Sequence, residues 1–303
     1  MLLDYYKAKL NIDEMPDFLY PYLNLWIIQR LKNITYLCGM DYASKDIYDF
    51  KEEITRYDHS LTTALMTWML THNKVITISS LFHDASTPAF SHTIDYMNKD
   101  YIKQESTEDK LSYLLYNDAE LNNLLYKDNI NISDIINFKK YSIVDNERPK
   151  LCVDRLDGII LSGISWTGEV NENVVDLLLG SLEVYNHNGE IEIGFNNFMA
   201  AVLATGINDN INKLCHSKED IYMMELMASI IKTCIERKYI SYDSLYILNE
   251  KCILAILDNI KDADIKDKLN KFYNIKKNDI PNFTLPKIKK RVINPLVNNE
   301  RIK

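Results

Sequence analysis

The sequence predicts an all-α fold with a small β-hairpin insert, and three observations lead to this prediction. Glycine and proline, which interrupt helices, number only 8 and 7 in the 303 residues. Long stretches repeat apolar residues at helical spacing. Apolar residues make up 47% of the chain, which is enough for a substantial core. A chain of 303 residues can form one large helical domain.

Helices are predicted where apolar residues recur every three or four positions. The helix from residue 58 carries the apolar run Leu61 to Leu70, the helix from residue 74 carries Val75 to Phe82, and the helix from residue 150 carries Leu151 to Leu161. The ends of each helix are placed to within about 2–4 residues. The predicted helices span 16–38, 58–71, 74–84, 106–126, 150–163, 170–180, 196–214, 218–237, 242–258 and 262–272.

One segment departs from the helical pattern. Residues 183–193 alternate apolar and polar side chains on either side of Asn188-Gly189. Asn-Gly suits a two-residue turn whose residues both have positive φ, and such turns join antiparallel strands. The sequence therefore predicts a β-hairpin over residues 183–193.

The C-terminal residues have a different composition. We expect one domain over residues 1–280, including a helical C-terminal extension, and a basic tail over residues 281–303. A solvated tail is the favoured interpretation, and docking onto an acidic neighbouring subunit is the alternative. The basic residues of the tail are Lys287, Lys289, Lys290, Arg291, Arg301 and Lys303.

Charge and cysteine content argue against several classes of protein. The net charge is −8 and the pI is about 5.3, so broad nucleic-acid binding through a basic face is not expected. The five cysteines include no Cys-x-x-Cys pair, which favours reduced thiols in a cytoplasmic protein. The N-terminus lacks the pattern of a signal peptide, and no apolar run reaches the about 20 residues of a membrane helix. No membrane partner is expected.

A candidate metal centre is distributed over three predicted helices. His83 and Asp84 end the apolar run Val75 to Phe82, where a buried carboxylate is costly unless it has a partner. His59 lies at the start of one helix and Asp154 at the start of another. Two imidazoles and two carboxylates could hold one divalent ion and leave positions open for water and a phosphate oxygen, which is typical of a catalytic site.

These residues resemble the H…HD…D pattern of the HD superfamily of metal-dependent phosphohydrolases. Within it, the chain is most similar to deoxynucleoside triphosphate triphosphohydrolases of the dGTPase type. The resemblance covers roughly residues 20–260 in order. Its segments are Gln29-Arg30-Leu31, Arg56-Tyr57-Asp58-His59-Ser60, His83-Asp84, Phe90-Ser91-His92 and Val153-Asp154-Arg155-Leu156-Asp157, and the predicted hairpin falls where that family has one.

The resemblance implies an HD-domain helical fold and a metal-dependent phosphohydrolase. His59, His83, Asp84 and Asp154 would bind one divalent ion, which could be Mn, Fe, Zn, Ni, Co or Mg. Such an ion lowers the pKa of a bound water and polarises a phosphate oxygen. The substrate would be a nucleotide or a related small phosphoester, with a deoxynucleoside triphosphate as the leading specific candidate.

The resemblance also assigns roles to residues around the ion. Arg56 and Arg155 would neutralise phosphate charge, and an arginine can hold phosphate in a fork. His92 would protonate the leaving oxygen, although a core histidine bonded to backbone is the structural alternative. Glu108, or its neighbour Glu105, could transfer a proton, and Tyr36 takes the place of a residue that contacts the sugar.

Three further positions bear on the site. Asp157 would either orient a metal ligand or form an ion pair with Arg155. Thr87 and Thr107 stand where the family has histidines, so the second hypothesis is a regulatory module that binds a nucleotide, retains the metal and has lost efficient turnover.

A di-iron oxygenase of the same superfamily needs more histidines than His92 alone supplies between Asp84 and Asp154. Members of the family often assemble, so a homo-oligomer is a further expectation.

Overall fold

The computed structural model describes residues 1–106 and 108–301, which are mostly helical with one small mixed sheet. This confirms the predicted fold class. Thr107, one of the two positions where a family histidine is missing, lies outside the described residues. In chain order, the helices are α1 (Leu2–Lys9), α2 (Leu19–Leu23), α3 (Trp26–Gln29), α4 (Arg56–Thr71), α5 (Lys74–Phe82), α6 (Thr93–Met97), α7 (Leu111–Asn117), α8 (Ala119–Lys127), α9 (Ile132–Ile136), α10 (Val153–Ser162), α11 (Glu172–Gly180), α12 (Phe198–Cys215), α13 (Lys218–Glu236), α14 (Ser244–Ile247), α15 (Glu250–Asn259) and α16 (Ala263–Asn274).

Three of the long predicted helices are wrong as single elements. Residues 16–38 form the short α2 and α3 and a 3₁₀ helix over Arg30–Asn33, and Leu25 between α2 and α3 has an extended backbone (φ −63°, ψ 140°). Residues 106–126 contain α7 and α8, which meet at Asp118, and residues 242–258 contain α14 and α15, which are separated at Asn249. Asp118 and Asn249 each accept a backbone N–H of the next helix, so they begin a helix where continuous periodicity predicted its interior.

The predicted hairpin is present and belongs to a larger sheet. Strands β1 (Leu182–His187) and β2 (Glu190–Phe195) pair antiparallel, and the turn residues Asn188 and Gly189 have φ values of 55° and 87°. Strand β3 (Leu296–Val297) pairs parallel with β2, and β4 (Glu300–Arg301) pairs antiparallel with β3. The last two strands come from the segment that was predicted as a tail.

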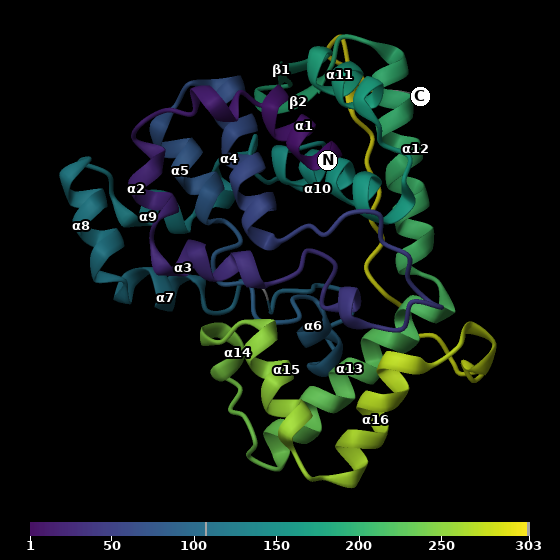
Figure 1. Cartoon of the computed structure of the whole chain (residues 1–303). Helices are drawn as coiled ribbons and strands as arrows, with labels where there is room; N and C mark the ends of the chain where they lie inside the picture. The colour runs from purple at the N-terminus through teal and green to yellow at the C-terminus, as the bar shows by residue number, and fades with distance from the viewer. Residues whose placement is uncertain (107, 302–303) are drawn as a thin grey trace.

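The interpretation of that segment as a solvated tail is wrong. Residues 281–301, which we call the strap, run back along α12 toward the sheet (Figure 1). The backbone N–H groups of Lys289 and Asn294 donate to the carbonyls of Tyr101 and Pro149, at 2.9 and 2.7 Å. Apolar side chains of the strap, among them Ile293, are buried. Backbone hydrogen bonds and apolar burial therefore hold the strap to its own chain.

The core has two parts with a cavity between them. One part joins α1–α5 and α7–α12, and the other joins α6 and α13–α16, the group at the lower end of Figure 1. Residues of both parts line a cavity of about 570 Å³, for example Phe138 and Ile159 of the first and Tyr48 and Met224 of the second. The predicted metal ligands, together with Arg56, Arg155, His92, Glu108 and Tyr36, all line this cavity.

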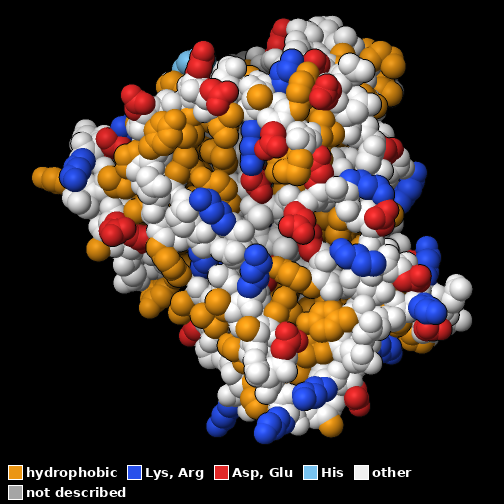
Figure 2. Space-filling model, viewed as in Figure 1, with side chains coloured by type: hydrophobic (Ala, Val, Ile, Leu, Met, Phe, Trp, Pro, Cys, Tyr) orange, Lys and Arg blue, Asp and Glu red, His pale blue; other side chains and the backbone are white. Residues whose placement is uncertain are grey.

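None of the helices in residues 1–106 and 108–301 combines the length and the hydrophobicity that a membrane crossing requires. Figure 2 shows acidic and basic side chains interspersed over the visible face, with apolar side chains between them.

Candidate metal centre

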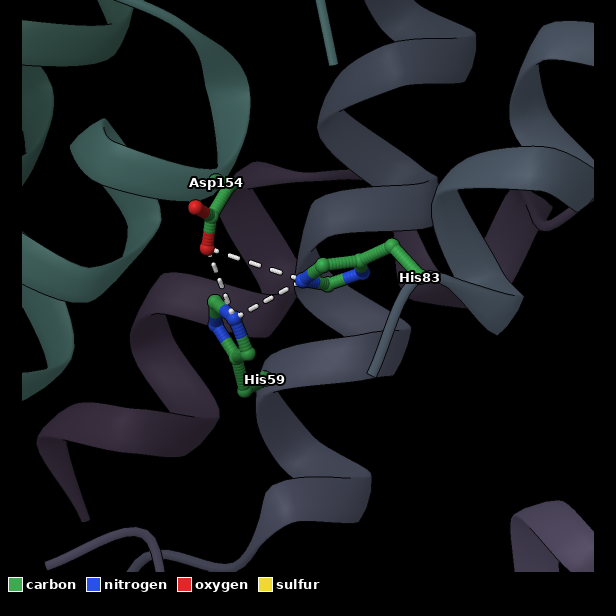
Figure 3. Close-up of side chains that lie close together, drawn as sticks. All are labelled: His59, His83 and Asp154. Atoms are coloured by element: carbon green, nitrogen blue, oxygen red, sulfur yellow. Dashed lines mark hydrogen bonds and ion pairs between the residues drawn. The ribbon is translucent and has the colours of Figure 1, made fainter. Parts of the chain in front are cut away.

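Three helices bring two imidazoles and a carboxylate together. His59 lies in the first turn of α4, His83 directly follows α5, and Asp154 lies in the first turn of α10. The Nε2 atom of His59 is 3.2 Å from Nε2 of His83 and 3.1 Å from Oδ1 of Asp154, and the third side of this triangle measures 3.5 Å. Figure 3 shows the three side chains pointing toward one another.

The hydrogen bonds behind the imidazoles fix which ring nitrogen faces the centre. Nδ1 of His83 lies 2.7 Å from the carbonyl oxygen of Ser80, which can only accept, so this nitrogen carries the proton. Nδ1 of His59 lies 2.7 Å from Oδ2 of Asp157, whose other oxygen accepts from Tyr6 at 2.5 Å. With Nδ1 as the donor, a neutral imidazole presents a lone pair at Nε2. Two such lone pairs and an oxygen of Asp154 therefore converge.

This arrangement suits a divalent cation. Ligand atoms about 2.1 Å from one ion lie roughly 3.0–3.4 Å apart at octahedral or tetrahedral angles, close to the sides of the triangle. His59 and His83 are buried, so the repulsion of converging lone pairs is poorly screened by water. Imidazole and carboxylate together favour ions such as Zn²⁺, Mn²⁺ or Fe²⁺. The residues present fit one divalent ion.

The electrostatics of the centre show the same need for positive charge. Burial lowers the pKa of His59, but hydrogen bonds to Asp154 and Asp157 outweigh burial and raise this pKa to about 10. The pKa of His83 is also raised, because the carboxylates of Asp84 and Asp154 outweigh burial. The two histidines hold the pKa of Asp154 well below its usual range in spite of burial. In the metal-free protein, protonation of a histidine thus supplies part of the positive charge that a metal ion would bring.

Asp84, the fourth predicted ligand, lies farther from the other ligand atoms. Its oxygens are 3.8 Å from Nε2 of His59 and 3.9 Å from Nε2 of His83. Oδ2 also accepts from Arg56 at 2.8 Å. Asp84 therefore lies at the edge of the group formed by His59, His83 and Asp154. Its carboxylate also bonds to Arg56.

Arg56 and Tyr36 form one wall of the centre. The guanidinium of Arg56 bonds to Asp84 and Ser91 and lies 4.9 Å from the ring centroid of Tyr36, which is itself 5.2 Å from the ring of His59. The Tyr36 hydroxyl would be 2.7 Å from a Cβ at Gly158, so the absent side chain leaves it room. Both predicted residues thus adjoin the candidate metal ligands.

His92 lies at the start of α6 and lines the cavity. The structural alternative, a core histidine bonded to backbone, is not what forms, because the partner of its ring is the Asp95 carboxylate. Nδ1 of His92 bonds to Oδ2 of the buried Asp95 at 2.8 Å, so Nε2 is the ring nitrogen available to a ligand of the cavity. The pKa of His92 is lowered, chiefly by burial, and Arg56 and Arg291 add to this effect in opposition to Asp95. A lowered pKa keeps the ring neutral near pH 7.

Two of the predicted residues are held by other groups. The four terminal N–H groups of Arg155 bond to Asp145, to the backbone of Lys150, and to the side chain and backbone of Asn146. Glu108 forms an ion pair with Lys139 at 2.5 Å. Both residues line the cavity, but Arg155 fastens the loop over residues 145–150. The alternative pair of Arg155 with Asp157 is not formed, because Asp157 bonds to His59 and Tyr6 and so orients a candidate ligand.

Sequence reasoning missed several polar residues of the cavity. Arg148 and the strap residues Lys289 and Arg291 line it, and Tyr6 of the unpredicted α1 supports Asp157. These contacts join segments that are far apart in the chain. The one available signal was the group of basic residues near the C-terminus, which was interpreted as solvated.

Comparison with known proteins gives a distant relative. No family model matches the sequence. The chain is 24% identical over 277 residues to the uncharacterized protein YdhJ of Bacillus subtilis (strain 168), an alignment that covers 89% of this chain and 81% of that protein. The name of that relative assigns no activity, so the chemistry has to be argued from the site.

Proposed function

We propose that this chain is a metal-dependent phosphohydrolase of the HD type that hydrolyses a nucleotide or a related small phosphoester. The observation that carries the proposal is the convergence of two imidazole lone pairs and one carboxylate oxygen beside a cavity of about 570 Å³. The order of His59, His83-Asp84 and Asp154 in the sequence supports the same assignment. A deoxynucleoside triphosphate is the leading specific substrate.

The residues around the centre suit this chemistry. A divalent ion held by His59, His83 and Asp154, with Asp84 beside them, would supply Lewis acidity and a water of lowered pKa. Arg56 would stabilise the charge that develops on a phosphate group, since its guanidinium is already oriented by Asp84 and Ser91. His92 would protonate the leaving oxygen from its imidazolium form, which Asp95 orients and stabilises and which the lowered pKa leaves in the minority near pH 7.

Hydrolysis by the purified protein with Mn²⁺ tests the proposal. A panel of dNTPs, NTPs, nucleoside monophosphates and cyclic dinucleotides, read by product mass, is compared between the wild type and Asp154→Ala. We expect turnover that Asp154→Ala reduces at least about 100-fold, because loss of a charged ligand disrupts the ion. Release of intact triphosphate supports a dNTP as the substrate, whereas release of orthophosphate from monophosphates indicates a phosphomonoester substrate instead.

A second candidate function is a nucleotide-binding regulatory module that keeps the metal without efficient turnover. The bonds that hold Arg155 and Glu108 favour it, because they occupy two groups that were expected to act on a phosphoester. Nucleotide binding by the metal-loaded wild type, with no turnover by any divalent metal, would favour this candidate. Turnover that is abolished by His83→Ala would exclude it.

A further inference from the structure

Three cations of the strap and of the loop over residues 145–150 line the cavity without an ion-pair partner in the described part of the chain. Arg148 lies in the loop that Arg155 fastens, and Lys289 and Arg291 lie on the strap. No ion pair is formed by Arg148, Lys289 or Arg291 within the described residues, although exposed cations of this chain such as Lys9 and Lys99 do form them. We call these three residues the strap cluster.

The backbone on either side of Arg291 is fixed. Its N–H donates to Oδ1 of Asn212 at 2.8 Å, and its carbonyl accepts from Nδ2 of Asn208 at 2.7 Å, so α12 grips this residue from both sides. The guanidinium donates to Oε1 of Gln104 at 2.8 Å. Gln104 is buried and has a φ of 60°, an uncommon conformation for a residue with a side chain. Hydrogen bonds to both the backbone and the guanidinium therefore fix the position of Arg291 beside the cavity.

The partners of the cluster are all neutral. Nζ of Lys289 donates to the carbonyl of Lys103 at 2.9 Å, and Arg148 donates to the carbonyl of Val292 at 3.4 Å. Burial lowers the pKa of Arg148 to about 10, and the nearby charges of Arg155 and Arg291 contribute. The pKa of Lys289 is lowered as well, by burial first and then by Arg291 and Arg148. The three charges repel one another, and none of them lies within ion-pair distance of a carboxylate among the described residues.

The acidic residues of the cavity form no ion pair with the cluster in the described part of the chain, although, in spite of burial, Asp220 helps to raise the pKa of Arg291. Asp145 is paired with Arg155, and Glu108 with Lys139. Asp220 accepts from Tyr48 at 2.8 Å, and burial raises its pKa to about 7. Glu105 and Glu147 also line the cavity, but both are exposed and neither forms an ion pair in the described part of the chain.

We propose that the strap cluster is an anion subsite that binds a phosphate group other than the one at the metal centre. The ligand of the cavity would then carry at least two phosphate groups, as a polyphosphate chain or a bisphosphate does. Guanidinium groups suit this task because their N–H groups match phosphate oxygens in a fork. The placement of the first phosphate rests on the proposed function, whereas the anion subsite itself does not.

Binding to the metal-free protein tests the subsite separately from catalysis. The full chain is stripped of metal with a chelator, dialysed, and titrated with inorganic tripolyphosphate in a calorimeter at low ionic strength. We expect binding that weakens about tenfold or more in Arg291→Gln and in Arg148→Met, since each loses a charge-assisted hydrogen bond. Lys290→Met is the matched control, because Lys290 lies on the same strap but is exposed, and its affinity should equal that of the wild type.

The design separates loss of the subsite from loss of the strap. Arg148 lies outside the strap, so Arg148→Met tests the subsite even if Arg291→Gln releases the strap from α12, and circular dichroism with a thermal midpoint monitors each variant. Wild-type protein that does not bind tripolyphosphate, or an Arg148→Met protein with unchanged affinity, would overturn the proposal. Orthophosphate that binds as tightly as tripolyphosphate would also contradict a ligand with several phosphates. Because no turnover is measured, a failed hydrolysis assay leaves this result intact.

Discussion

At the scale of single residues, the metal centre depends on groups behind the ligands. Asp157 is fully buried and holds the ring of His59, while Tyr6 holds Asp157. Such supports fix the ring orientation and strengthen the ligand. The carbonyl of Ser80 does the same for His83. These bonds decide that Nε2 of each ring faces Asp154.

We expect Asp157→Asn to weaken divalent metal binding by about 10- to 100-fold, because a neutral amide is a poorer partner for the His59 ring. Affinity is measured by competition with a fluorescent chelator. Tyr6→Phe is the matched variant, since it removes only the bond that holds Asp157, and its effect should be smaller. Equal affinity of Asp157→Asn and the wild type would contradict this role of Asp157.

The protonation of His59 gives a pH dependence. Its pKa in the folded, metal-free protein is about 10, above the ~6.5 of an unfolded chain. Its proton therefore stabilises the metal-free fold fully below about pH 6.5, and this contribution is lost as the pH rises through 10. We expect the free energy of unfolding of metal-free protein, measured with urea, to fall from pH 7 to pH 10. His59→Gln should show a shallower fall, and an equal slope in both proteins would argue against the prediction.

At the scale of elements, α4 begins with a capping box that sets the position of the site. Thr55 accepts from the backbone N–H of Asp58 at 3.2 Å, and the Asp58 carboxylate accepts from the backbone N–H of Thr55 at 2.8 Å. Arg56 and His59 lie in the turn that this box closes. The cap therefore orients both a candidate metal ligand and its neighbouring guanidinium.

We expect Thr55→Ala to lower the free energy of unfolding by about 1 kcal/mol, the usual cost of a lost N-cap. Thr55→Ser keeps the hydroxyl and should remain near the wild type in the same urea titration. The distance from the cap to His59 is short, so metal affinity should fall in Thr55→Ala as well. A stability loss of equal size in both variants would show that the methyl group, and not the cap, is responsible.

The hairpin supplies a second prediction for an element. Gly189 has a φ of 87°, and a side chain in that conformation is strained, so Gly189→Ala should cost about 1 kcal/mol. Gly180 ends the helix α11, and nothing lies within 4 Å of a Cβ placed there. Gly180→Ala should accordingly be neutral or stabilise the protein by up to about 1 kcal/mol. Thermal unfolding of both variants compares the two glycines, and equal shifts would contradict the argument.

At the scale of the whole molecule, the strap joins the C-terminal residues to the hairpin of residues 182–195 in one sheet. Arg301 donates to both oxygens of Glu192, each at 2.6 Å, and Glu192 is buried in β2. The same carboxylate accepts the backbone N–H of Leu151, next to the helix that carries Asp154. The strap thus supports the site from the sheet as well as lining the cavity.

We expect Arg301→Ala to destabilise the protein by about 2–3 kcal/mol, somewhat below the 3–5 kcal/mol of a fully buried pair, because a buried carboxylate loses its cation. Arg237→Ala breaks exposed pairs with Asp262 and Asp264, which water screens, so its free energy of unfolding should stay near that of the wild type. Urea titrations of both variants measure the difference. The double change of Arg301→Ala with Glu192→Gln should recover part of the loss, and no recovery would contradict the stated cause.

Much of the fold followed from local pattern. The helices α4, α5, α10, α12 and α13 lie close to their predicted ranges, because a periodic apolar face persists through each of them. The hairpin was predictable because Asn188-Gly189 permits a turn that few other pairs allow. The breaks at Leu25, Asp118 and Asn249 were not, because apolar periodicity continues across them and capping competes with helix continuation only in the folded chain.

The sequence by itself determined that this protein is mostly helical and that His59, His83, Asp84 and Asp154 are candidate ligands, because helix periodicity and ligand chemistry are local properties. The tertiary structure decided which atoms converge, since distances between α4, α5 and α10 depend on how these helices pack. It also decided the place of the strap. The basic residues of the strap were expected to be solvated, because no partner is near them in sequence. Their hydrogen-bond partners lie on α12, the sheet and the loops, and such long-range contacts form only once the chain has folded.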